Sequence, residues 1–484
     1  MHKQFMGGRL RRLREEARLT QAELARRLGL SASYLNQLEN NQRPLTVAVL
    51  LKLKAQFGAE VERFGDDEGM HLVAQLREIA HDLPAGGQGG GMPLSQAEIK
   101  ELVANMPGAA RALVTLYQQR RHLTEQLEAL TVGTDAQRNG QPAAGMPPSA
   151  PYEEVRDFFF ARNNHIALLD EAAEAFAQQC DLPQGAAAEA ALVAQLRQRH
   201  GVQTRMLTGV GEDTPRMLRH YDPQRRVLCV RASISAGQRA FQLATQLALL
   251  EAGSHIDLLV QSAGFGSDHA RGLARIGLAN YYAGALLLPY GAFLQAARDC
   301  RYDVEVLSQR FGVGFETICH RLSTLQRPSD RGIPFFFIRV DRAGNISKRQ
   351  SATHFHFSKI GGTCPLWNVY EAFAQPGRIV VQLARMPDGR TYLWLARTVS
   401  GAGTGWGRPR KTFSVALGCD IRHARELVYA QGLDLADPQA AVPIGMGCKV
   451  CERQGCTQRA FPPLGRPLQV DENVNQSAPY AALP

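Results

Sequence analysis

The sequence predicts a multidomain, mainly α-helical protein with an α+β domain at its C-terminal end. Two stretches rich in Gly and Pro, 84–93 and 133–151, separate segments in which apolar residues recur at helical spacing. From Pro334 onward the pattern changes to short β-branched and aromatic runs bounded by turns, which is typical of strands. The length of 484 residues agrees with about three domains.

These changes in pattern divide the chain into five parts. We expect an all-α helix-turn-helix domain at 1–66, a helical linker and candidate dimerisation segment at 94–131, a mainly helical domain with a small sheet at 152–325, an α+β domain at 330–470 and a flexible tail at 471–484. The candidate strands are Arg226–Arg231, Phe335–Val340, Arg378–Ala384 and Thr391–Thr398.

Composition and charge limit the class of protein. The formal net charge of +10 favours an anionic partner such as nucleic acid. The N-terminus has no apolar segment of the signal-peptide kind. The longest uncharged run, Ile276–Ala297, contains Pro289, which should end a helix, so we interpret the run as buried helix and expect no membrane partner. Nine cysteines, an odd number, argue against a disulfide framework and favour a cytoplasmic protein.

The N-terminal domain contains two short helices joined by a tight turn. Thr20 and Glu23 form a capping box at the start of the first helix, and Gly29 supplies the left-handed residue that ends it. Ser31 caps the second helix. Leucines at helical spacing face inward, which leaves small and polar residues outward on the second helix. Arg9–Ala17 and Thr46–Phe57 are expected to be flanking helices.

This segment resembles the phage-repressor type of helix-turn-helix over about 55 residues. The resemblance implies that the second helix enters the major groove of a double-stranded DNA operator, and that two or more copies bind a palindromic site as a homodimer or higher homo-oligomer. A glutamine in that helix can make a bidentate contact to adenine, and the start of the first helix favours a phosphate. The implied DNA-binding residues are Gln21, Ser31, Ser33, Tyr34, Asn36, Gln37, Asn40 and Arg43.

The helical stretch 94–131 has an apolar stripe but little core of its own. Its apolar residues include Ile99, Val103 and Leu113, and the stripe continues through Leu123, Leu127 and Leu130. The pair Pro107-Gly108 should split it into two helices. Two interpretations stay open: the stripe pairs with another subunit, or it packs on its own chain.

A helix in the middle domain, residues 238–251, resembles the active helix of a metallopeptidase-like domain. Active relatives carry His-Glu-x-x-His there, because zinc needs two imidazoles one turn apart and a glutamate to activate water. The matching positions are Thr245, Gln246 and Leu249, and the third ligand position is matched by Asn280. We therefore expect no enzyme activity, and a metal-dependent peptidase acting on a repressor is an unfavoured alternative.

The whole chain to about Asn473 resembles the short-chain fatty acyl-CoA regulator family, whose members control propionate and acetate metabolism. The resemblance is carried by residues 159–166, 335–339 and 364–368 and by the final cysteine cluster. It implies a transcriptional regulator whose middle domain binds an acyl-CoA effector, with Arg and aromatic groups for the phosphates and the adenine. The candidate ligand-binding residues are Phe160, Arg162, Arg205, Arg219, Arg239 and Tyr281. The alternative for the aromatic members is that they are core.

The C-terminal cysteines form a C-x2-C-x4-C cluster of Cys448, Cys451 and Cys456. Three thiolates this close can serve zinc or an iron–sulfur cluster, and three free thiols are the alternative. We expect Cys419 as the fourth ligand, with Cys364 and His423 as alternatives. The family resemblance favours a four-iron [4Fe-4S] cluster over zinc and leaves a redox-sensing regulator as a second functional hypothesis. The other four cysteines are expected to be buried hydrophobic side chains.

Overall fold

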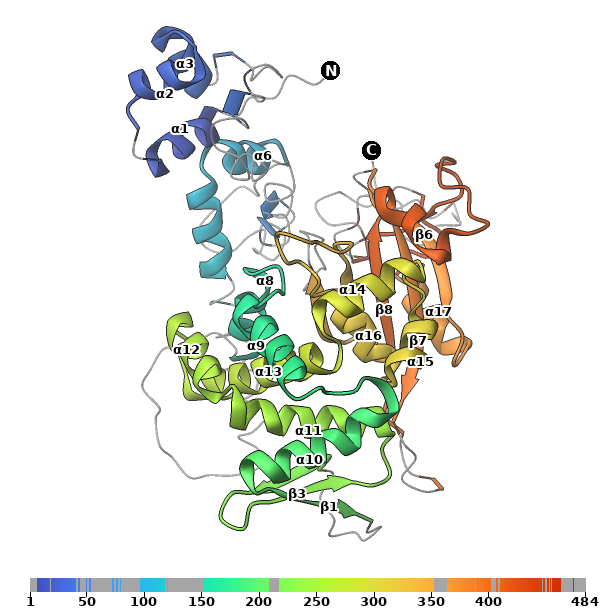
Figure 1. Ribbon diagram of the computed structural model, residues 1–484. Coiled ribbons are helices and arrows are strands. Elements are labelled where there is room, and N and C mark those ends of the chain that lie inside the picture. The colour runs from blue at the N-terminus through green and yellow to red at the C-terminus, as the bar shows by residue number, and fades with distance from the viewer. Residues whose placement is uncertain are drawn as a thin grey trace, which may run out of the picture. The chain divides into compact units, whose positions relative to one another are not determined.

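The computed structural model describes residues 7–17, 19–40, 42–43, 96–117, 151–208, 217–351, 364–387, 389–401, 410–445, 447–448 and 455–462, with isolated positions elsewhere such as 49, 120 and 451 (Figure 1). The chain divides into two compact units. Unit 1 comprises 1–147 with 464–467, and unit 2 comprises 148–463 with 468–484. Most of the tail predicted at 471–484 lies outside the described residues.

Unit 1 begins with the predicted helix-turn-helix. Its helices are α1 (Gly7–Glu16), α2 (Gln21–Leu28) and α3 (Ala32–Glu39). The capping box of Thr20 and Glu23 is present, Gly29 has φ 58°, and the Ser31 side chain accepts a hydrogen bond from the Tyr34 amide, as predicted. Leucines of all three helices pack into one core. Most of the predicted helix Thr46–Phe57 lies outside the described residues.

The second part of unit 1 confirms the predicted break at Pro107-Gly108. Helix α6 (Gln96–Asn105) ends before Met106, and residues 107–117 are helical again. One face of this pair packs into a small core with residues of the preceding segment. The buried members of that core are Leu72, Leu76, Ile79, Ile99, Val103, Ala110, Val114 and Tyr117. The leucines at 123, 127 and 130 lie outside the described residues.

Unit 2 begins as a helical assembly around one long central helix. Its helices are α8 (Pro151–Phe160), α9 (Ala167–Gln179), α10 (Ala188–His200), α11 (Ala236–Glu251), α12 (Gly253–Ala263), α13 (Asp268–Leu287), α14 (Tyr290–Asp299), α15 (Val304–Phe311), α16 (Phe315–Leu322) and α17 (Asn368–Ala374). Short 3₁₀ turns cover Gly185–Ala187, Ile421–Glu426 and Val428–Ala430. Helix α13 packs against α8, α9, α11 and α12 (Figure 1). The run 276–297 is thus two buried helices, which separate at Leu288 and Pro289.

A small three-stranded sheet packs beside α10 and α11. It consists of β1 (Gln203–Leu207), β2 (Arg219–Asp222) and β3 (Val227–Arg231), in the order β1-β3-β2. Strand β1 is parallel to β3, and β2 is antiparallel to it. Only β3 was predicted, because its alternating buried residues give the period-2 signal, whereas β1 and β2 are mostly polar and bury no residue fully.

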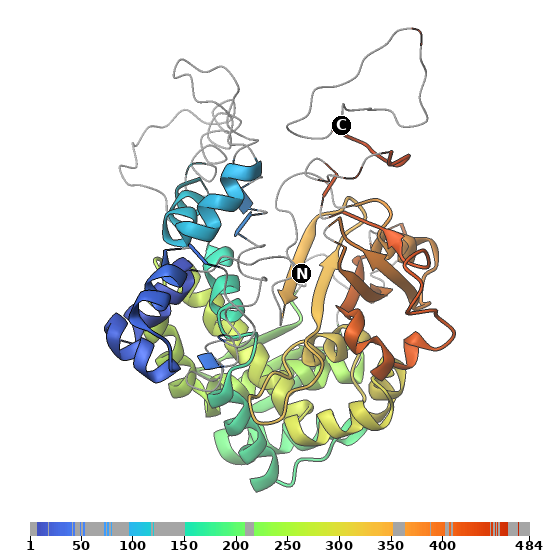
Figure 2. The ribbon, with the colours of Figure 1, turned by 90° about the horizontal axis from the view of Figure 1, so that it is seen from above.

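The C-terminal sheet has six strands in the order β5-β4-β8-β7-β6-β9. It forms the orange and red part of the ribbon (Figures 1 and 2). The strands are β4 (Phe336–Val340), β5 (Ile346–Ser351), β6 (Val380–Arg385), β7 (Thr391–Ser400), β8 (Thr412–Asp420) and β9 (Val442–Pro443). All pairings are antiparallel except that of β6 with β9. The three strands predicted in this region are confirmed as β4, β6 and β7.

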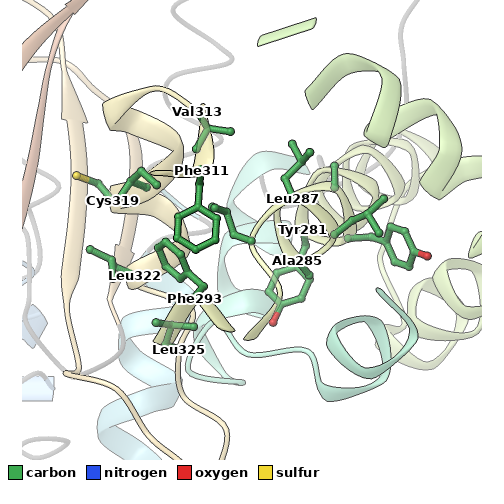
Figure 3. Close-up of a cluster of buried hydrophobic side chains, with 14 of the residues drawn as sticks. Tyr281, Ala285, Leu287, Phe293, Phe311, Val313, Cys319, Leu322 and Leu325 are labelled. Carbon is green, nitrogen blue, oxygen red and sulfur yellow. The ribbon is translucent and has the colours of Figure 1, made fainter. Parts of the chain in front are cut away.

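The two faces of this sheet enter different cores because side chains alternate along each strand. Phe337 and Leu417 face the helices α14 to α16 and join their core. Phe336 and Trp394 face the other way and pack with α17 and Trp367. The predicted boundary near residue 330 therefore separates two segments that share one hydrophobic core. Figure 3 shows the helical side of that core, in which the rings of Phe293 and Phe311 meet edge to face at 5.2 Å.

A buried ion pair joins the helices of unit 2. Arg321 on α16 donates to Asp170 on α9 at 2.6 Å, and both side chains are at most 3% exposed. The Tyr281 hydroxyl donates to the second Asp170 oxygen at 2.8 Å and accepts from the Ile166 amide. Arg321 also donates to the Leu288 carbonyl. Both oxygens of Asp170 and all three nitrogens of Arg321 thus have a hydrogen-bond partner.

The ionisation of Asp170 follows from these contacts. Burial alone would raise the pKa of this carboxyl, but the charge of Arg321 and the hydrogen bonds from His165, Arg321 and Tyr281 lower it to about 2. Because the folded-state pKa lies below the ordinary value of 3.8, the pair stabilises the fold fully above that value, and the contribution is lost as pH falls through about 2.

Arg321→Met should destabilise the protein by about 3–5 kcal/mol, because it leaves the Asp170 charge buried without its partner. Arg298→Met is the matched control, because Arg298 pairs with Asp330 where both side chains are more than 40% exposed, and it should cost less than about 1 kcal/mol. Denaturant unfolding of the two full-length variants measures the difference. Equal losses would contradict the structural role given to the buried pair.

Candidate functional site

Helix α3 presents a small, polar surface to solvent. Ser33 and Asn36 are exposed, and Tyr34 and Gln37 are half-buried at the edge of the domain core. The capping residue Ser31 and the following residues Asn40 and Arg43 are exposed as well. Seven of the eight predicted DNA-binding residues thus lie on α3 or directly beside it, and the eighth, Gln21, begins α2. Such a face suits contacts with base edges and phosphates.

A buried carboxylate, which the sequence analysis did not single out, orients this face. Glu39 is 5% exposed and accepts from Arg14 Nε at 2.7 Å and from Gln21 Nε2 at 2.7 Å. Asn36 Oδ1 accepts from Asn40 Nδ2 at 2.8 Å. These bonds fix the side chains of Gln21 and Asn36, so part of the interface is ordered before any partner binds.

The predicted former metal site in unit 2 is brought together by α11 and α13. Thr245 Oγ1 donates to the Phe241 carbonyl at 2.7 Å and lies 3.3 Å from Asn280 Oδ1. Thr245 and Gln246 are buried, and Leu249 is half-buried. A hydroxyl, two amides and an aliphatic side chain thus occupy the four positions. They include neither imidazole nor carboxylate, the donors that a catalytic zinc requires.

The six candidate ligand-binding residues fall into two groups. The first group, Phe160, Arg162 and Tyr281, lies at α8 and α13. Arg162 is exposed, its guanidinium carbon lies 3.9 Å from the centre of the Phe158 ring, and it donates to the Phe158 carbonyl. Tyr281 is 4% exposed and its hydroxyl is used within the protein, as the core alternative expected. Arg162 is therefore the member of this group with a charge open to solvent.

The loop after α8 holds Arg162 in place through an uncommon backbone conformation. Asn163 and Asn164 both have positive φ, at 50° and 57°. Non-glycine residues adopt this region at a cost and are found there more often in sites than elsewhere. Asn164 is buried, so the turn is fixed by the fold.

The second group surrounds the small sheet. Arg205 is exposed on β1. Arg219 is half-buried, so that burial lowers its pKa, and it donates to the Gln242 carbonyl. Arg239 makes two hydrogen bonds to Glu189, at 2.6 and 2.9 Å. Because α8 and β1 lie at opposite ends of the helical part of unit 2 (Figure 1), the six residues do not form one site.

Two of the C-terminal cysteines, Cys451 and Cys456, lie near Cys364, whereas Cys419 lies on the opposite face of the sheet. Burial raises the pKa of the Cys364 thiol, and hydrogen bonds from the amides of Gly445 and Leu366 lower it. Negative charge at Cys451 and Cys456 raises this pKa further, because these two thiols lie close to Cys364. Cys364 belongs to the core on the α17 side of the sheet. Cys419 points to the opposite face, among the side chains that pack on the helices. Successive side chains of β8 point to opposite faces of the sheet, and this places Cys419 on the face away from the loop that carries the other cysteines.

The cysteine loop is organised around a buried arginine. Arg459 is 4% exposed and donates to the carbonyls of Cys448, Cys451 and Arg453. The Ala460 amide donates to Cys448 Sγ at 3.2 Å. A Cβ added at Gly445 would lie 2.6 Å from Cys451 Sγ, so glycine leaves the space that this thiol uses. Within the described residues, no three His, Cys, Asp or Glu side chains lie close enough together to hold one metal ion.

A surface pocket of about 540 Å³ lies elsewhere in unit 2. Its lining residues are Glu305, Pro376, Gly377, Arg378, Ile379, Val381 and Tyr429. None of these residues was singled out from the sequence, because they come from three segments more than forty residues apart and share no motif.

Three family models match consecutive parts of the chain: "Helix-turn-helix" at 10–64, "IrrE N-terminal-like domain" of the M78 peptidases at 197–323, and "Short-chain fatty acyl coenzyme A regulator, C-terminal" at 324–480. Together with the α2–turn–α3 geometry, these matches define a helix-turn-helix transcriptional regulator. The chain belongs to the short-chain fatty acyl coenzyme A regulator family.

Relatives of nearly the same length carry the same combination. The HTH-type transcriptional regulator PrpR of Mycobacterium tuberculosis is 50% identical over 99% of this chain and 96% of its own. RamB of the same organism is 49% identical, over 99% of each chain. The propionyl-CoA carboxylase regulator of Cereibacter sphaeroides is 41% identical, over 99% and 98%. A solved Mycobacterium tuberculosis transcriptional regulator is 53% identical, with a TM-score of 0.66, over 69% of this chain and all of that one. The expected family is confirmed.

Within the described part of the chain, no helix is long and apolar enough to cross a membrane. The uncharged run Ile276–Ala297 is interrupted where α13 ends.

Gln37→Ala should weaken binding to the cognate operator by about 1–3 kcal/mol, because it removes a bidentate contact to a base. Gln295→Ala is the control, because Gln295 is exposed on α14 in the other unit. Operator titration at one fixed salt concentration compares the two. An unchanged affinity for Gln37→Ala alongside the control would remove Gln37 from the base-reading residues.

Proposed function

We propose that this regulator controls genes of short-chain acyl-CoA metabolism and that an acyl-CoA is its effector. One observation carries the DNA-binding part of the proposal: α3 is capped, supported by a leucine core, and presents only small or polar side chains outward. The description of the family and the name of the Cereibacter relative support the metabolic assignment. The residues Gln21, Ser33, Asn36 and Gln37 are the core of the proposed operator contact.

We place the effector site at α8 and its following loop. Arg162 offers a guanidinium that is exposed on one side and stacked on Phe158 on the other. A planar cation of this kind can bind a phosphate by two hydrogen bonds, and the adjoining aromatic ring suits an adenine. The left-handed turn at Asn163 and Asn164 fixes the position of the arginine, so little ordering is required on binding. Arg239 is occupied by Glu189 and is left out of this site.

Arg162→Met should lower the affinity for propionyl-CoA by about tenfold or more, since a hydrogen bond to a charged group contributes about 1.5–3 kcal/mol. Arg205→Met, from the second group, should leave it unchanged. Calorimetric titration of the full-length protein measures both. Weakening by Arg205→Met alone would move the site to the small sheet.

The effector role itself is tested by an operator gel shift titrated with a panel of acyl-CoA thioesters. A ligand can change operator affinity only if it binds the DNA-competent and incompetent states differently. We expect short acyl chains to change the operator affinity. Indifference to every short acyl-CoA would contradict the effector while leaving DNA binding intact.

We further propose that Cys364, Cys448, Cys451 and Cys456 together hold a metal cofactor, with a four-iron cluster preferred to zinc. The donor set supports the proposal, because cysteine thiolates are the ligands that both zinc and iron–sulfur clusters take, and the four cysteines are free thiols. Arg459 supplies positive charge beside the thiols, and no described carboxylate forms an ion pair with it. When bound, such a cluster would supply one-electron redox chemistry, which would make the regulator responsive to redox state.

Cys364→Ser should abolish metal retention as completely as Cys451→Ser, whereas Cys419→Ser should retain it. Iron, sulfide and zinc analysis after anaerobic purification gives the result. Stoichiometric zinc without iron would overturn the cluster assignment, and loss of metal in Cys419→Ser would restore Cys419 as the fourth ligand.

The middle domain is proposed to bind and not to catalyse. Thr245, Gln246 and Leu249 replace both imidazoles and the glutamate of the catalytic motif, and Asn280 replaces the third ligand. The relatives' names are those of regulators. A peptidase of the zinc type would require donors that these positions do not have.

A further inference from the structure

One of the three tryptophans of the chain is fully exposed. Trp367 and Trp394 are buried in the core on the α17 side of the C-terminal sheet, whereas Trp406 lies in the loop between β7 and β8 with its whole side chain in solvent. Tryptophan is highly buried on average, so full exposure of this residue type is unusual. Gly407 follows it with φ 72°, a left-handed conformation that glycine adopts without strain, so a turn presents the indole to solvent.

Two cations follow Trp406 where the loop joins β8. Arg410 and Lys411 are both exposed, and no described carboxylate forms an ion pair with either of them. The Gly401 amide donates to the Lys411 carbonyl, so the hairpin is still closed at this point and fixes the backbone of the lysine. Lys411 Nζ lies 5.4 Å from the centre of the Phe413 ring, which leaves its charge at the surface.

The turn between β4 and β5 adds a third cation at the same end of the sheet. Val340 at the end of β4 pairs with Ser414 near the start of β8, so residues 341–345 and the β7–β8 loop lie beyond the same strand ends. Arg342 in this turn is exposed, and within the described residues it has no ion-pair partner. The carboxylate of Asp341 accepts hydrogen bonds from two amides and a side chain of its own turn. We call Arg342, Trp406, Arg410 and Lys411 the basic end of the sheet.

The carboxylates one row further into the sheet are already neutralised. Arg339 and Arg397 both lie opposite Val415, from β4 and β7. Arg339 pairs with Glu316 at 2.7 Å, and Arg397 pairs with Glu305 at 3.2 Å. The basic end therefore keeps an excess of positive charge around one exposed aromatic ring, and such a surface favours an anionic partner.

We propose that the basic end of the sheet binds the sugar–phosphate backbone of DNA that flanks the operator. Lys and Arg bind phosphates independently of sequence, so these contacts add affinity without adding specificity. The indole of Trp406 offers an N–H donor for a phosphate and a flat apolar surface for a sugar. The proposal rests on operator binding by α3, because DNA held by unit 1 is present at a raised effective concentration for unit 2 of the same chain.

The composition of the basic end favours DNA over an anionic membrane. Surfaces that bind such membranes combine basic residues with several large apolar side chains that enter the lipid. Among its described residues, the basic end has one large apolar side chain, that of Trp406. A membrane is therefore the less favoured partner, and vesicle binding tests it.

The salt dependence of DNA binding tests the two cations of the loop. Arg410→Gln with Lys411→Gln removes two charges from the basic end, and Arg197→Gln with Arg225→Gln removes two exposed charges elsewhere in unit 2. Both are full-length proteins, titrated with the operator inside a long duplex and with a duplex trimmed to the operator. On the long duplex, the slope of log affinity against log salt should become less steep by about 1–2 per bound chain for the loop variant, because each phosphate contact contributes about 0.9. The control should match the wild type, and all three proteins should agree on the trimmed duplex.

The fluorescence of Trp406 gives a second readout. Because Trp367 and Trp394 are buried, quenching by acrylamide, which is uncharged, reports mainly on Trp406. The Trp406→Phe variant identifies this signal by losing it. We expect the long duplex to remove most of the quenching in the wild-type protein and the trimmed duplex to leave it unchanged.

Other outcomes overturn the proposal. A loop variant with the wild-type salt slope on the long duplex shows that the two cations do not contact DNA, and quenching of Trp406 that the long duplex leaves unchanged shows the same for the indole. Binding to phosphatidylserine vesicles that is lost in Trp406→Ala, with DNA binding unaffected, would assign the basic end to a membrane. The affinity of the wild-type protein for the trimmed duplex measures α3, so a failure of the proposed operator contact appears there and a failure of the basic end appears on the long duplex.

Discussion

The buried ion pair of Asp170 and Arg321 is the interaction on which unit 2 depends. The two residues are 151 positions apart, and their hydrogen bonds reach α9, α13, α16 and the Leu288 carbonyl between α13 and α14. Removing two charges from water is costly, and the cost is offset only where every polar atom finds a partner. The pair therefore requires one arrangement of these helices. That arrangement positions the α8 loop that carries Arg162 and the surface on which the C-terminal sheet packs.

The same constraint explains how a metallopeptidase scaffold retains its fold without the catalytic donors. A metal held by α11 and α13 would crosslink the two helices. In this chain the Thr245 hydroxyl of α11 donates to the Asn280 side chain of α13 instead. Small side chains on α11, such as Ala244 and Ala248, allow the two helices to pack closely. The buried ion pair ties α13 to two further helices. The stability of the scaffold is thus independent of catalysis, and its surfaces are free to take another role.

Local signals made much of this structure predictable. The cap at Thr20, the turn at Gly29 and the break at Pro107 depend on residues within one turn of each other, and all three are present. Contacts between distant segments were not predictable in this way. Strand β5 has a mostly polar sequence because it lies at the edge of the sheet, so it lacked the apolar pattern of a strand. Cys419 and Cys364 could be assigned to opposite sides of the sheet only once the side-chain directions along β8 were known. Glu39 was missed because its partners, Arg14 and Gln21, lie in other helices.

The shared core of unit 2 also bears on how two inputs would combine. The sheet that carries Cys364 on one face buries Phe337 on the other, against the helices that are tied to Asp170. Packed cores do not deform continuously, so a change in the sheet or in the helices is transmitted through the common interior. An effector bound beside Arg162 and a cofactor bound by the cysteines would therefore both contact elements that share the core of unit 2. Any coupling between them would be reciprocal, with each altering the binding free energy of the other by an equal amount.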